Sequence, residues 1–117
     1  MMQIKILIAG RNKDALTSME ERLLNSRYQV SIRHISNGHA DPLHGVPDLP
    51  DLLIFHMDEN DEAELTCLVE RPQELRPATL IIGPGGNTRL MRLAMKAGAI
   101  DYLEDPAKDS DLTEVLE

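Results

Sequence analysis

Three of the four histidines, His34, His39 and His44, recur at intervals of five residues, and imidazole is a common metal ligand. An interval of five matches neither one face of a helix nor one side of a strand. The segment around them adds only Asp41 and Asp48 as further ligands. The spacing therefore favours solvated loop histidines, with a metal site as the less favoured alternative.

The segment Gly83-Pro-Gly-Gly-Asn-Thr88 has the composition of a phosphate-binding loop and precedes a helical pattern. Its spacing fits neither the Walker nor the dinucleotide fingerprint. A tight turn that supplies Asn87 or Thr88 as the N-cap of the helix explains the same residues. Because the glycines follow a predicted strand, where doubly wound sheets bind ligands, a site for a small anion or nucleotide stays open as an alternative.

Catalysis and redox chemistry find little support. Cys67 is the single cysteine, so no disulfide forms within the chain, and a lone cysteine of this kind is usually a small buried hydrophobe. No arrangement of serine, histidine and aspartate indicates a nucleophilic enzyme. We predict no enzymatic activity, no catalytic residue, no metal and no cofactor.

The net charge limits the partners and the location. Twenty acidic against 12 basic residues give a formal charge of -8, which repels phosphate backbones and anionic lipid. The first apolar run, Ile4 to Ala9, is too short for a signal peptide or a membrane span. We expect no nucleic-acid binding, no direct membrane insertion and a cytoplasmic location.

Short apolar runs alternate with helical patterns, which is typical of βα units around a parallel sheet. With 117 residues, we predict a single domain, 1–117. The second run alternates as an edge strand does, whereas the first, third and fourth are continuously apolar, like central strands. The runs are Ile4 to Ala9, Tyr28 to Ile35, Leu52 to Met57, Thr79 to Ile82 and Ile100 to Leu103.

Helical patterns follow the first, third and fourth runs. They predict a helix capped by Asn12, a second over about Asp61 to Arg71, and a third over about Thr88 to Ala97 that ends at Gly98. Prolines and glycines between Ser36 and Pro50 leave room for a loop with at most one turn. A last helix from Asp109 has about two turns, so we expect the chain to be the N-terminal part of a longer protein.

Two segments give the chain a family resemblance. Pro50-Asp-Leu-Leu-Ile-Phe-His56 resembles the third strand of CheY-like receiver domains, and Ala97-Gly-Ala-Ile-Asp-Tyr-Leu-Glu-Asp-Pro106 resembles the fifth. The resemblance covers essentially the whole chain. It implies a flavodoxin/CheY-like α/β fold with a doubly wound five-stranded parallel sheet of order 2-1-3-4-5. The loop between Ser36 and Pro50 leaves the second helix of that fold short or absent.

In that family an acidic pair binds magnesium, an aspartate accepts phosphate, and a hydroxyl residue and a lysine bind the phosphoryl group. The matching positions here are Gly10 and Arg11 for the acidic pair, His56 for the acceptor, Gly83 for the hydroxyl residue and Asp105 for the lysine. Arg11 repels a metal ion and Asp105 repels a phosphoryl group. We therefore predict a degenerate site that is not phosphorylated.

The exchanged charges have two interpretations. Arg11 and Asp105 form an internal ion pair in place of metal and phosphate, with His56 beside it, or both reach solvent from loop ends. Asp58 as a displaced acceptor would lack its metal and its lysine. Tyr102 matches the family's switch aromatic, and Gly83 removes its hydroxyl partner. Tyr102 is thus either held in one rotamer as part of a binding face or a tyrosine at the edge of the core.

Charges of opposite sign separate in the C-terminal half. We predict a homodimer or a hetero-complex through the fourth helix, the fifth strand and the fifth helix of the family's fold. Solvated charges on a monomer are the alternative. The candidate interface is Arg89, Arg92, Lys96, Asp101, Glu104, Asp111 and Glu114.

The degenerate site and the length resemble the N-terminal domain of Tad/Flp pilus-assembly ATPases of the ParA/MinD type. This resemblance implies a non-phosphorylated protein-interaction domain in signalling or in the localisation of pilus assembly. A sensor of a small anion or nucleotide is the alternative, and a conventional phosphorelay response regulator is a more distant one.

Overall fold

The computed structural model describes residues 4–23, 28–35, 49–57, 62–70, 74, 76–104 and 112, with the backbone alone for 62–65. All five strands are parallel, in the order β2-β1-β3-β4-β5. The predicted α/β class, strand order and five strand positions are confirmed. The strands are β1 (Ile4–Gly10), β2 (Tyr28–His34), β3 (Leu52–His56), β4 (Ala78–Gly83) and β5 (Ala99–Glu104).

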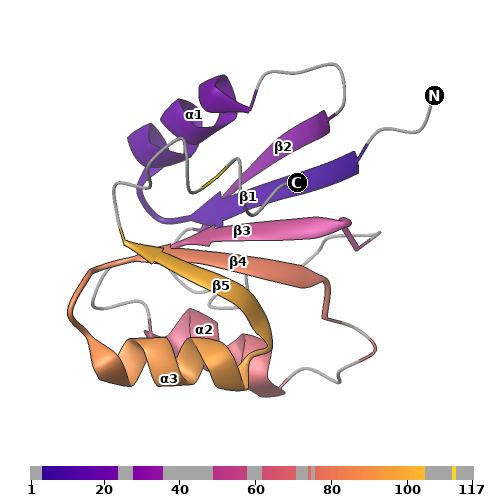
Figure 1. Ribbon diagram of the computed structural model, residues 1–117. Helices are drawn as coiled ribbons and strands as arrows, with labels where there is room; N and C mark the ends of the chain where they lie inside the picture. The colour runs from indigo at the N-terminus through magenta and orange to yellow at the C-terminus, as the bar shows by residue number, and fades with distance from the viewer. Residues whose placement is uncertain are drawn as a thin grey trace.

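In the described ranges, the three helices α1, α2 and α3 cover the two faces of this sheet. The helix α1 (Lys13–Arg22) lies on one face, and α2 (Glu62–Glu70) and α3 (Thr88–Lys96) lie on the other (Figure 1). Asn12 caps α1 by accepting a hydrogen bond from the Ala15 N–H at 3.1 Å. Asn87, and not Thr88, caps α3 through the Leu90 N–H at 3.1 Å. No helix in the described ranges is long and apolar enough to cross a membrane.

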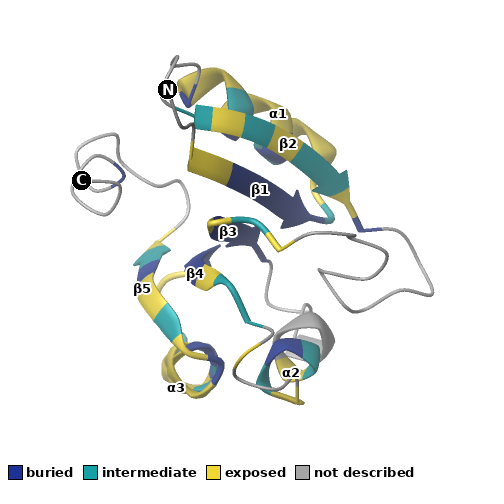
Figure 2. Ribbon diagram, turned by 90° about the vertical axis from the view of Figure 1, so that its right-hand side faces the viewer, coloured by how far each residue is buried: buried dark blue, intermediate teal, exposed yellow. Residues whose placement is uncertain are grey.

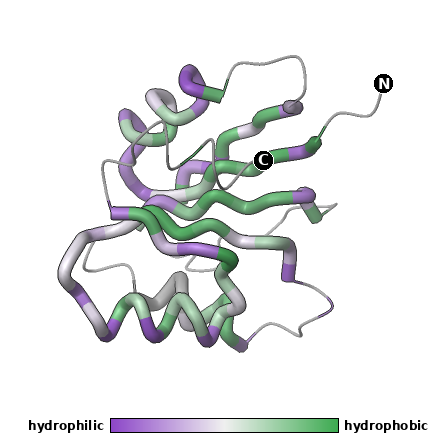
Figure 3. The backbone as a smooth tube through the Cα atoms, in the orientation of Figure 1, coloured by the Kyte–Doolittle hydropathy of each residue, from purple (hydrophilic) through white to green (hydrophobic). Residues whose placement is uncertain are grey.

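Apolar side chains fill the space on each side of the sheet. All of β3 is buried, whereas β2 alternates, and its Tyr28, Val30 and Ile32 pack against the core on the α1 side (Figures 2 and 3). The predictions of a central third strand and a half-exposed second strand are therefore confirmed. Leu112 belongs to the same α1-side core. Cys67 on α2 is half-buried rather than fully buried.

Arg76 joins the last turns of α2 and α3, a contact that the sequence did not predict. Its Nη2 donates to the Val69 carbonyl at 3.1 Å, and its Nη1 donates to the Ala97 and Lys96 carbonyls at 3.4 and 3.5 Å. The carbonyls at the end of a helix have no partner within the helix and carry partial negative charge. One guanidinium thus caps two helices and holds them together.

Several predictions fall outside the described residues. They are the loop between Ser36 and Pro50, of which only 49–50 are described, the histidines His39 and His44, and the alternative acceptor Asp58. The predicted final helix is represented by the helical residue Leu112 alone. Asp105, Asp111 and Glu114 also lie outside the described ranges.

Candidate functional site

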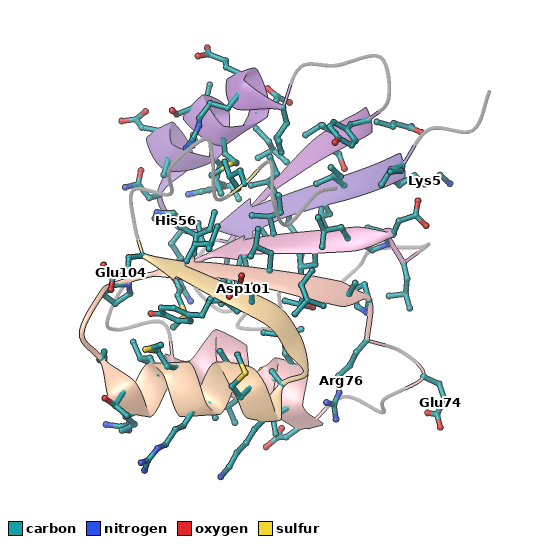
Figure 4. The ribbon with its side chains drawn as sticks, in the orientation of Figure 1. Lys5, His56, Glu74, Arg76, Asp101 and Glu104 are labelled. Carbon is teal, nitrogen blue, oxygen red and sulfur yellow. The ribbon has the colours of Figure 1, made fainter. Side chains whose placement is uncertain are left out.

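The described positions of the predicted degenerate site meet at the carboxyl edge of the sheet. Gly10 pairs with His56 across β1 and β3, and Gly83 pairs with Glu104 across β4 and β5. Figure 4 shows His56 and Glu104 at this same edge. Because all strands run in parallel, the last residues of neighbouring strands must come together here.

Gly10 has no room for a side chain. A Cβ on this residue would stand 2.6 Å from the His56 carbonyl oxygen and 3.2 Å from Cδ2 of Leu16. The nearer obstacle belongs to the backbone of a buried strand, which cannot yield as the end of a long side chain can. An acidic residue at position 10 therefore requires the ends of β1 and β3 to move apart.

The space beside Gly83 is filled by two buried side chains. A Cβ on Gly83 would stand 2.6 Å from the Tyr102 hydroxyl oxygen and 2.9 Å from Cγ of Met57. Met57 is fully buried, and Tyr102 is 9% exposed. The Tyr102 hydroxyl donates a hydrogen bond of 2.8 Å to the Pro84 carbonyl. The tyrosine thus occupies the place where the receiver family has its hydroxyl side chain.

Burial and charge both keep the Tyr102 hydroxyl protonated. Desolvation raises the pKa of Tyr102 above its ordinary value, and the nearby Glu104 carboxylate raises this pKa further. A protonated hydroxyl is the form that can donate to the Pro84 carbonyl. The inward orientation of the ring is thus consistent with a hydroxyl that stays protonated and donates to Pro84.

His56 ends β3 and is only 5% exposed. Its strand neighbours are Gly10 on β1 and Ile82 on β4. An imidazole cannot form an acyl phosphate, which is the chemistry of the aspartate at this position in the family. The burial of His56 also leaves a phosphate donor little access to the ring.

Arg11 and His34 lie next to the same edge. The His34 Nε2 is 2.9 Å from the Arg11 carbonyl oxygen, so this imidazole connects the end of β2 to the end of β1. No group of three histidine, cysteine, aspartate or glutamate side chains in the described ranges is arranged to hold a metal ion. The proposed pairing of Arg11 with Asp105 stays a prediction.

The glycine-rich loop after β4 is in contact with the carboxylate of Glu104. A Cβ on Gly85 would stand 2.7 Å from Cδ of Glu104, so the Glu104 carboxylate rests on the loop. Gly86 has a φ of 75°, which requires glycine in a tight turn, and Asn87 then caps α3. A negative charge above the loop disfavours an anionic ligand there. The geometry favours a turn that leads into α3.

The two flanks of α3 carry different surfaces, one apolar and one basic. Since an α-helix repeats every ~3.6 residues, Met91 and Met95 lie on the flank of α3 opposite Leu93. Met91 is 42% exposed, Met95 is 54% exposed, and Ile100 of β5 is 53% exposed. The sequence reasoning missed these three residues, although two methionines four residues apart beside the core positions Leu90 and Ala94 were a usable signal.

The basic residues of α3 lie around a groove on its other side. Thr88, Arg89, Arg92, Leu93 and Lys96 line this groove, which has a volume of about 520 Å³. Figure 3 shows hydrophilic residues along the side of α3 that is turned away from the sheet. The basic residues of the predicted interface thus lie on α3, apart from its described acidic residues. The acidic pair, Asp101 and Glu104, lies on β5 instead.

The edge strand β5 contains an irregularity at Ile100. Thr79 pairs with Ala99 but Leu80 pairs with Asp101, so Ile100 is an extra residue that forms a bulge. Next to it, the Tyr102 backbone N–H donates to Oδ1 of Asp101 at 2.8 Å. The bulge and the carboxylate both disturb the backbone pattern that a further strand would need.

The sheet order, the two helical layers and the position of the degenerate site define a CheY-like receiver fold. Among solved structures, the chain is similar to the pilus assembly protein CpaE of Caulobacter crescentus, with 17% identity, a TM-score of 0.73 and coverage of 97% of this chain and 91% of that chain. No protein-family model and no curated protein sequence matches the chain.

Two response regulators are similar to the same extent. The CheY-like response regulator of Mesorhizobium loti has 13% identity, a TM-score of 0.71 and coverage of 98% of this chain and 97% of that chain. The CheY-like receiver domain protein of Methanospirillum hungatei has 20% identity, a TM-score of 0.75 and coverage of 98% and 91%. At these identities the similarity establishes the fold, and the predicted receiver architecture is confirmed.

Proposed function

We propose that this chain is a receiver-like protein-interaction domain that acts without phosphorylation, in pilus assembly or in signalling. The similarity in fold to CpaE proteins and to CheY-like receivers supports the class of process. The packing around Gly83 supports the loss of phosphorylation, because Tyr102 and Met57 fill the space next to it. That packing is the observation on which the proposal depends.

The contact between Tyr102 and Gly83 also bears on the movement of the switch aromatic. In receivers the aromatic residue moves inward when phosphate draws the hydroxyl residue toward the acceptor. Here Tyr102 is already inside, it is hydrogen bonded to Pro84, and Gly83 has no side chain that could exclude it. We infer that the domain stays in one conformation, so that binding depends on the presence of the partner and not on a phosphoryl signal.

We assign the interaction to the flank of α3 next to β5, named here the methionine surface and made of Met91, Met95 and Ile100. These side chains are apolar and exposed, and methionine adapts its shape to different partners. Asp101 and Glu104 border this surface from β5. A second copy of the chain or a different protein covers it, with Asp111 and Glu114 as further members of the predicted interface.

Phosphorylation is tested with acetyl phosphate and magnesium. We expect no gain in mass in the intact protein and no change in its amide NMR spectrum. A CheY-like receiver with its acidic residues serves as the positive control. A gain of one phosphoryl group, wherever it is attached, would contradict the proposal and revive the phosphorelay alternative.

The methionine surface is tested by sedimentation over a range of concentrations. Charge placed at Met95 by Met95→Glu should weaken self-association if the partner is a second copy, whereas Ile4→Glu, at an exposed apolar side chain of β1, should leave it unchanged. A wild-type chain that stays monomeric would rule out the homodimer. Equal association of both variants and wild type would rule out the methionine surface as the dimer contact.

A further inference from the structure

The basic groove on α3 is separate from the degenerate site and from the methionine surface. Leu93 is half-buried and packs against the core, so it forms the floor of the groove. Arg89, Arg92 and Lys96 stand around it. An apolar floor with cations at its rim suits an amphipathic ligand that carries negative charge.

Two of the three cations are available to a ligand. Arg92 and Lys96 are exposed, and within the described part of the chain neither side chain forms an ion pair. The chain as a whole carries a formal charge of -8. Three basic residues on one short helix are therefore a local reversal of the overall charge, and such reversals determine the orientation and the choice of partners.

The helix that carries the groove is well fixed. Asn87 caps its N-terminus, and Arg76 connects the Lys96 and Ala97 carbonyls to Val69 of α2. A surface that is rigid before binding loses less conformational entropy when the partner arrives. The backbone that carries the groove is thus fixed before a partner binds.

We propose that this groove binds an acidic segment of a protein partner, with two or three carboxylates on the rim and one apolar side chain on Leu93. The inference goes beyond the proposed function, because it adds a second surface on the opposite flank of α3. A small anion fits less well, because the cations are exposed on long side chains and lie around an apolar floor. Nucleic acid or an anionic membrane contacts far more of the acidic chain than a short acidic segment does, so the net charge of -8 opposes these partners more strongly.

The probe is a synthetic dodecapeptide of the repeat Glu-Glu-Leu, with Gln-Gln-Leu as the neutral control peptide. Titration of the isotope-labelled protein with the acidic peptide should shift the amide signals of residues 88–96 most strongly. Arg92→Glu should weaken binding about fivefold. Lys13→Glu makes the same change in net charge at an exposed residue of α1, and this variant should bind the acidic peptide like wild type.

Three results would overturn the proposal. One is equal affinity of Arg92→Glu and Lys13→Glu, which would show attraction by net charge alone. The second is equal binding of the neutral peptide, and the third is a stronger shift of residues 88–96 by tripolyphosphate than by the acidic peptide, which would indicate a small-anion site. The peptide titration uses the isolated chain and no second protein, so failure of the methionine surface would leave this result intact.

Discussion

The hydroxyl oxygen of Tyr102 lies 2.6 Å from the point where a Cβ on Gly83 would stand. Tyr102 therefore excludes any larger side chain at position 83 as long as its ring points inward. In the receiver family these two positions communicate through a movement. In this chain the two residues are in direct contact, and the ring of Tyr102 fits inside because Gly83 has no side chain.

A threonine in place of Gly83 should disturb this packing. Gly83→Thr should lower the free energy of unfolding by about 2 kcal/mol, because the new side chain overlaps Tyr102 and Met57 and breaks the hydrogen bond to Pro84. Chemical denaturation measures the loss. In the background of Tyr102→Ala the same threonine should cost clearly less, and additive effects in this double-mutant cycle would show that the two residues do not compete for space.

The close approach at Gly10 makes a second substitution costly. Gly10→Ala should lower the free energy of unfolding by about 1 to 3 kcal/mol, since its Cβ meets the backbone carbonyl of His56. Gly85→Ala is the matched control, because the three nearest atoms to its Cβ all belong to the movable carboxylate end of Glu104, and it should cost under about 1 kcal/mol. Equal losses in the two variants would contradict the distinction between a backbone and a side-chain obstacle.

The raised pKa of Tyr102 predicts a dependence of stability on alkaline pH. Its folded-state pKa lies above the unfolded value of about 10, so the folded protein holds this proton more tightly. The contribution of this proton to the free energy of unfolding is fully present below pH ~10. It is lost as the pH rises through the folded-state pKa of Tyr102. Phenolate absorbance of the Tyr28→Phe variant reports Tyr102 alone.

Glu104 provides the control for that titration. Glu104→Gln should lower the pKa of Tyr102 but leave it above about 10, because burial is the larger cause of the shift. A Tyr102 that titrates at its ordinary value in both proteins would mean that the ring is exposed in solution.

The contacts of Arg76 predict a further loss of stability. Arg76→Ala should lower the free energy of unfolding by about 1 to 2 kcal/mol, because it leaves the carbonyls of Val69, Lys96 and Ala97 without their donor. Glu74→Ala changes an exposed residue two positions away (Figure 4) and should stay within about 0.5 kcal/mol of wild type. Similar losses in both variants would show that the guanidinium does not hold the two helices.

The strands and helices were predictable because the patterns behind them are local. Continuous apolar runs predict buried parallel strands, and the alternation of β2 predicts an edge strand, so residue spacing alone gives both. The capping by Asn12 is a similar local signal. The strand order depended on the resemblance, because periodicity does not say which strands are neighbours.

The details of the site were less predictable because they depend on distances between segments far apart in the chain. The sequence shows that Gly83 lacks a hydroxyl, but not that Tyr102 fills the space or that Glu104 covers Gly85. Arg76 gave no sequence signal, since one arginine before a strand is commonplace. The basic residues of α3 were visible in the sequence, but the groove around Leu93 was not, because a list of charges does not show how a surface is shaped.

The bulge at Ile100, with the Asp101 carboxylate on the Tyr102 N–H, has a consequence for assembly. A neighbour at this border of the molecule finds no regular ladder to extend and must recognise the shape and chemistry of individual side chains. This geometry disfavours the edge-to-edge pairing of β5 that would extend the sheet from one copy to the next. A single substitution of such a side chain can then change which partner binds, while the fold itself is preserved.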